Sequence, residues 1–60
     1  MFFTHDQFDT LVLASLNHRG AVMLQLARWG YRASRAAVLA DAVIGKRYHY
    51  TEGGVVIEAR

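Results

Sequence analysis

The absence of cysteine from a chain of only 60 residues is the feature that most restricts its fold. No disulfide can brace the chain and no thiolate can hold a metal, so a thin core must stabilise it alone. We therefore expect one small domain over residues 1–60. Because 53% of the residues are hydrophobic, more than such a core can hold, we expect an exposed apolar patch used in homo-oligomers or on a larger protein target. The alternative is that the many alanines simply lie at the surface.

Membrane insertion is not expected. The longest charge-free runs, Thr10–His18 and Gly20–Ala27, are much shorter than the roughly 18–20 apolar residues that a spanning helix needs. The opening MFFTHDQF has no basic segment ahead of an apolar stretch, so it does not resemble a signal peptide. We expect a cytoplasmic protein.

Charge is unevenly distributed although the net charge is only +2. No acidic residue occurs between Thr10 and Ala40, whereas four arginines do: Arg19, Arg28, Arg32 and Arg35. Lys46 and Arg47 extend this basic series. A basic middle with acidic flanks is typical of phosphate-binding surfaces, and it is equally typical of helices that are simply solvated.

Residues typical of helix starts and helix ends predict three helices. Thr4 and Gln7 form a capping box, and the phenylalanines on either side of it, Phe3 and Phe8, form a hydrophobic staple, so a first helix should cover residues 5–16. Asn17 should cap a second helix over residues 18–29, which ends at Gly30. Ser34 should cap a third over residues 35–44, which is apolar on nearly all sides and is therefore central or shared with a partner.

The end of the chain predicts a β-hairpin. Gly53 and Gly54 suit a two-residue turn in which both central residues have positive φ. This turn would pair Tyr50 with Ile57 and His49 with Glu58 and would direct Tyr48 and Tyr50 toward the helices. The predicted fold is α+β, with three short helices followed by a C-terminal β-hairpin (α-α-α-β-β).

Two segments resemble winged helix-turn-helix DNA-binding domains. The segment 34–38 (SRAAV) resembles the opening of their recognition helix, and 26–30 (LARWG) is similar to the end of the preceding helix. The resemblance covers residues 24–59. It implies a minimal winged-helix fold that binds double-stranded DNA, with the second helix of the pair in the major groove. The implied DNA contacts are Arg28, Arg32, Ser34 and Arg35 near the turn and Lys46, Arg47 and His49 on the wing.

The chain departs from this family in two ways. Three residues separate Gly30 from Ser34, two more than the tight turn usually has. After Arg35 the third helix also has no Arg, Lys, Asn or Gln, the residues that most often read bases.

Catalytic and metal sites are not indicated. The three histidines lack metal-binding spacing, the carboxylates are scattered, and the serines suit helix faces and caps. We expect no enzyme, no cofactor and no metal. Asp41, in the most apolar helix, should face solvent or pair with an arginine.

Two functions remain open. The first is a small dimeric DNA-binding transcriptional regulator, of the size that phages and plasmids often encode. The alternative is a compact inhibitor or adaptor module that docks on another protein through its apolar surface. The side chains expected at a protein interface are Trp29, Tyr31, Val38 and Ala42.

Overall fold

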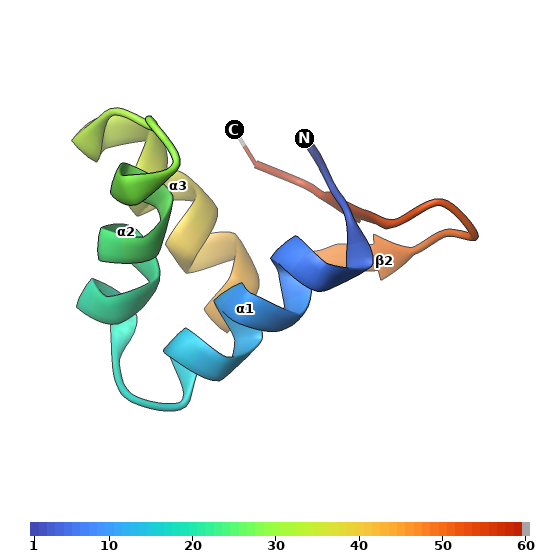
Figure 1. Cartoon of the computed structure of the whole chain (residues 1–60), viewed down its shortest axis with the longest axis horizontal. Helices are drawn as coiled ribbons and strands as arrows, with labels where there is room; N and C mark the ends of the chain where they lie inside the picture. The colour runs from blue at the N-terminus through green and yellow to red at the C-terminus, as the bar shows by residue number, and fades with distance from the viewer. Residues whose placement is uncertain (60) are drawn as a thin grey trace.

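The computed structural model describes residues 1–59 and confirms an α+β fold in which three helices precede a hairpin. Its elements are β1 (Phe2–Phe3), α1 (His5–Ser15), α2 (Arg19–Arg28), α3 (Ala33–Ile44), β2 (Tyr48–Tyr50) and β3 (Val55–Ile57). The helices lie on one side of the molecule and the small sheet on the other (Figure 1). The short strand β1 was not predicted, and it makes the sheet three-stranded.

The capping box predicted at the start of α1 is confirmed. Thr4 Oγ1 accepts a hydrogen bond from the Gln7 amide at 3.1 Å, and Gln7 Oε1 accepts one from the Thr4 amide at 3.0 Å. Phe3 and Phe8, the expected staple, are both buried. The helix ends one residue earlier than predicted, at Ser15, and Leu16 is 77% exposed.

The start of α2 lies one residue later than predicted. Asn17 donates its amide to the Ala14 carbonyl at 3.1 Å and so belongs to the closing turn of α1. His18 is the cap instead, and its Nδ1 accepts from the Ala21 amide at 3.1 Å. The expected stop at Gly30 is confirmed, since Gly30 has φ +97° and reverses the chain after α2.

The start of α3 lies two residues earlier than predicted. Arg32 occupies the N-cap position and its carbonyl accepts from the Ala36 amide at 2.8 Å, so Ser34 lies inside the first turn and is not the cap. The connection between α2 and α3 is therefore the four residues Trp29–Arg32. A turn of three or four residues with a glycine is typical of a helix-turn-helix.

Helix α3 is central in the domain. Five of its side chains are buried: Ala36, Leu39, Ala40, Ala42 and Val43. Ala42 was expected at a protein interface, and this expectation is wrong because its side chain is completely buried within the chain's own core.

The sheet is antiparallel with strand order β1-β3-β2. In the hairpin, His49 lies opposite Val56 and Tyr50 opposite Val55, so the predicted register is wrong by two residues and the expected pair of His49 with Glu58 does not form. A register shift of two residues leaves the same side chains together on each face of the hairpin. Val55 and Ile57 are accordingly buried as expected, whereas Tyr50 is 63% exposed.

A four-residue turn, with β1 close to Gly54, accounts for the register. Thr51 to Gly54 form a four-residue turn, in which the Thr51 amide donates to the Gly54 carbonyl at 2.7 Å. Neither Gly53 nor Gly54 has positive φ. Gly54 is required for another reason: a Cβ there would lie 2.3 Å from the Phe3 carbonyl oxygen.

This close approach predicts different effects for the two glycines of the turn. Gly54→Ala should destabilise the fold by about 1–3 kcal/mol, because backbone atoms of β1 must move. Gly53→Ala is the matched control, since a Cβ there has as its nearest neighbour a ring carbon of Phe2 at 3.9 Å. Thermal unfolding of both variants measures the difference, and equal melting temperatures would contradict the proposed role of Gly54.

Candidate nucleic-acid interface

One side of α3 faces away from the core. The buried positions 36, 39, 40 and 43 define the inner side, and the helical period places Ser34, Val38, Asp41 and Gly45 in a line on the opposite side. We call these four residues the outer line of α3. Ser34, Asp41 and Gly45 are exposed and Val38 is half-buried.

The basic residues predicted to bind DNA fall into two groups at opposite ends of α3. Arg28 ends α2, Arg32 caps α3 and Arg35 lies in the first turn of α3, so these three surround the α2–α3 turn. Lys46 and Arg47 lie between the end of α3 and the start of β2. The twelve residues of α3 span about 18 Å. His49 is exposed on β2, farther along the hairpin.

The N-terminus of α3 has no side-chain cap within residues 1–59. The first amides of a helix have no partner inside it, and together with the helix dipole they attract anions. Arg32 and Arg35 flank these amides, and the hydroxyl-bearing Ser34 is exposed beside them. The start of α3 is thus suited to a phosphate group.

The other end of α3 contains a strained residue. Lys46 has φ +57°, a left-handed conformation that is unfavourable for a residue with a Cβ. Its amide donates to the Val43 carbonyl at 3.2 Å, and the Arg47 amide donates to the Ala42 carbonyl at 2.8 Å. These two bonds are those of a Schellman motif, in which glycine usually occupies the left-handed position. In this chain a lysine occupies that position.

Asp41 pairs with an arginine, as expected. Arg19 at the start of α2 donates from Nε to Asp41 Oδ1 at 2.6 Å and from Nη2 to Oδ2 at 3.3 Å. This hydrogen bonding is the main reason that the pKa of Asp41 lies below its usual value, and the nearby charge of Arg47 adds to the lowering. The same bond raises the pKa of Arg19. Arg19 and Asp41 are about half-exposed, so the pair is open to solvent.

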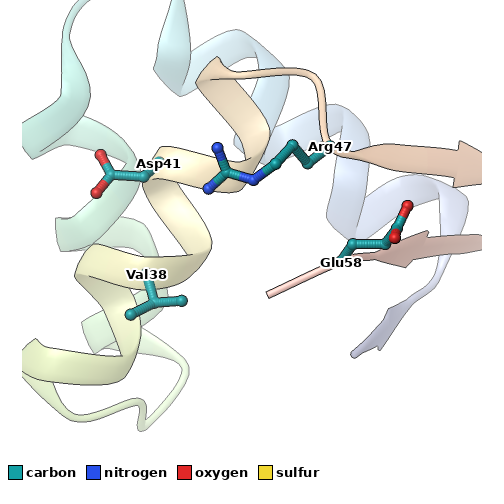
Figure 2. A pocket seen from close by; sticks show the side chains of 4 residues that line it. All are labelled: Val38, Asp41, Arg47 and Glu58. Atoms are coloured by element: carbon teal, nitrogen blue, oxygen red, sulfur yellow. The ribbon is translucent and has the colours of Figure 1, made fainter. Parts of the chain in front are cut away.

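A shallow hollow of about 330 Å³ lies beside the outer line of α3. It is lined by Val38, Asp41, Arg47 and Glu58, which come from α3, from the α3–β2 junction and from the segment after β3. Figure 2 shows the Arg47 side chain lying alongside α3 on the side of Asp41. The hollow therefore combines one apolar group with charges of both signs.

Trp29 and Tyr31, both expected at a protein interface, lie at the edge of the core. Trp29 is 36% exposed, with its ring centroid 6.3 Å from that of the buried Phe3, and Tyr31 is half-buried against the core. A second hollow, of about 360 Å³, lies between α2 and α3 and is lined by Gly20, Met23, Leu24, Ala27, Ala33 and Ala36. Leu24 was not singled out from the sequence, although its position opposite the buried Val22 and Leu26 signals exposure.

Comparisons with known proteins identify no relative: no protein-family model, curated protein or solved structure matches the chain. Within residues 1–59, no helix is long and apolar enough to cross a membrane. Over the same part of the chain, no three acidic or histidine side chains lie close enough together to hold a metal ion.

The Arg19–Asp41 pair predicts a measurable titration. A carboxyl group with a lowered pKa adds stability above the pKa of the unfolded chain, about pH 4, and this contribution disappears as the pH falls through the lower folded value. In Arg19→Gln the pKa of Asp41 should rise toward its usual value. NMR titration of the Asp41 carboxyl carbon in the wild type and in Arg19→Gln measures the change. An unchanged Asp41 titration would show that the pair does not persist in solution.

Proposed function

We propose that this chain is a small regulator that binds double-stranded DNA with the α2–turn–α3 unit, and that it acts by binding and not by catalysis. The observation that carries this proposal is the placement of basic residues at both ends of α3. The same proposal places the chain in the cytoplasm and treats it as a homodimer, for which exposed leucines such as Leu13, Leu16 and Leu24 provide apolar contact surface.

The dimensions of α3 suit the major groove. The groove is about 12 Å wide, whereas α3 is about 18 Å long, so a helix lying in the groove can bring each of its ends near a different phosphate backbone. Arg28, Arg32 and Arg35 would then contact one backbone, together with the unpaired amides at the start of α3. Lys46 would contact the other, with Arg47 beside it. His49 would extend the second group along the hairpin.

The connection between the two helices supports the same arrangement. A four-residue turn containing Gly30 joins α2 to α3, as in helix-turn-helix units. The hairpin follows α3 directly and begins beside the second basic group, which is the position of the wing in the family that the sequence resembles.

Affinity in this arrangement depends mainly on the phosphates. The outer line of α3 offers Ser34, Val38 and Asp41, and none of these has the two donors with which Arg or Lys reads guanine. Phosphate contacts fix position and supply affinity that depends strongly on salt.

Salt dependence tests the proposal. Binding to a random duplex, measured by fluorescence anisotropy, should weaken with salt, with a slope of log affinity against log salt of roughly −0.9 per phosphate contact. Arg35→Gln should reduce the slope by about one contact. Arg19→Gln is the matched control: its guanidinium already binds Asp41, so its loss should leave the slope unchanged.

A lack of binding to duplex at 50 mM salt and micromolar protein would contradict DNA binding. The hollow between α2 and α3 then favours the second candidate, a module that docks on another protein. Its small residues, Gly20, Ala27, Ala33 and Ala36, allow a partner to approach closely, and Leu24 provides an exposed apolar side chain there. Such a module would lose its partner when Leu24 is replaced by Asn.

Replacing Lys46 by glycine should have opposite effects on the stability of the fold and on the affinity for DNA. Lys46→Gly relieves the left-handed strain, so it should be more stable than Lys46→Ala by about 1 kcal/mol. Both variants remove the same charge, and both should weaken binding to duplex DNA to the same extent. Chemical denaturation and anisotropy measure the two effects, and binding that follows stability would contradict a phosphate contact by Lys46.

A further inference from the structure

The outer line of α3 lacks a group that can identify a base pair. Arginine, with donors directed at O6 and N7, is the side chain that most often reads guanine in the major groove. Beyond Arg35 in the first turn, α3 contains no arginine or lysine. Apart from Arg35 at the start of the helix, a guanidinium for this purpose must therefore come from outside α3.

Arg47 is placed to supply it. Its backbone is held on both sides, because its amide donates to the Ala42 carbonyl of α3 and its carbonyl accepts from the Glu58 amide, both at 2.8 Å. A Cβ on Gly45 would lie 3.0 Å from Arg47 Nη1, so the guanidinium lies over the last position of the outer line. Figure 2 shows the side chain running alongside α3 instead of out along the hairpin.

We propose that Arg47 reads a guanine in the major groove from the hollow beside α3, and that Asp41 is the positioning residue that orients it. This inference rests on the proposed function. It assigns to Arg47 a role different from that of Lys46, whose side chain contacts phosphate.

The charges around the hollow explain how Asp41 can act in this way. Arg19 holds the Asp41 carboxylate by two hydrogen bonds from the α2 side, and Arg47 lines the same hollow, with its side chain extended along α3 toward Asp41 (Figure 2). Within residues 1–59 the structure shows no hydrogen bond between Asp41 and Arg47, so Asp41 acts on the guanidinium through its charge and leaves the donors of Arg47 for a base. Glu58 adds a second negative charge at the rim, which disfavours a phosphate in the hollow itself.

Val38, the remaining residue that lines the hollow, is also suited to contact the edge of a base. Val38 is half-buried and contributes an apolar surface between Asp41 and the start of α3. Apolar side chains in the major groove contact the methyl group of thymine. The hollow therefore matches a guanine with a neighbouring thymine.

The test starts from sequences selected by the wild-type chain from a random duplex library. Anisotropy then compares the selected site with sites in which each guanine is replaced in turn. The wild type should prefer guanine over the other bases at one position of the site. Arg47→Ala should reduce this preference by about 5- to 150-fold, the range expected for the loss of a bidentate contact. Lys46→Gln, the adjacent control, should weaken binding to all sites equally.

Asp41→Asn distinguishes the orienting of Arg47 by Asp41 from the general effect of the Asp41 charge on DNA binding. It removes a negative charge, so affinity for random duplex should hold or rise, whereas the preference for that guanine should fall. Circular dichroism confirms that each variant is folded before binding is measured. If Arg47→Ala weakens selected and random duplexes alike, Arg47 contacts phosphate and this inference is wrong, although the proposed function stands. If the wild type binds no duplex at all, both are wrong.

Discussion

The burial of Phe3 connects the sheet, the first helix and the turn between α2 and α3. Its backbone pairs with Val55 in the central strand, and it directly precedes the cap of α1. Its ring lies 6.0 Å from that of Tyr31 and 6.3 Å from that of Trp29, both in the α2–α3 turn. One side chain thus fixes how the helix pair sits on the sheet. The orientation of α3 relative to the hairpin, on which the proposed DNA surface depends, rests on this contact together with the hydrogen bonds that join Arg47 to Ala42 and Glu58.

Local chemistry made much of the fold predictable. The capping box at Thr4 and the glycine at the end of α2 act within a few residues, so the sequence shows them directly. The errors arose where distant segments meet. The paired glycines suit a tight hairpin turn, but β1 packs against Gly54 and changes what the turn needs. The strand at Phe2–Phe3 is only two residues long, too short for any alternation to show, and the same residues already had an explanation as a staple.

In the candidate site, too, the groupings that are local in sequence could be predicted and those between distant residues could not. Arg28, Arg32 and Arg35 are close in sequence and surround one turn, so their grouping could be predicted. The hydrogen bonds between Arg19 and Asp41 join residues 22 positions apart, and sequence reasoning could anticipate an arginine partner without choosing among the candidates. The burial of Ala42 depends on how α3 packs against the rest of the chain. The proximity of Arg47 to the outer line of α3 depends on the left-handed Lys46, which no sequence pattern indicates.

The pairing of β1 with β3 also affects the order in which the chain folds. Phe2 and Val56 are partners near opposite ends of the sequence, so closing this sheet carries the loop entropy of nearly the whole chain. The helices contain local contacts and can form while the chain is still being synthesised. The central strand emerges last, and until then Phe3 has no strand to pair with. The three-stranded sheet is therefore completed in a late step, when β1 and β3 meet.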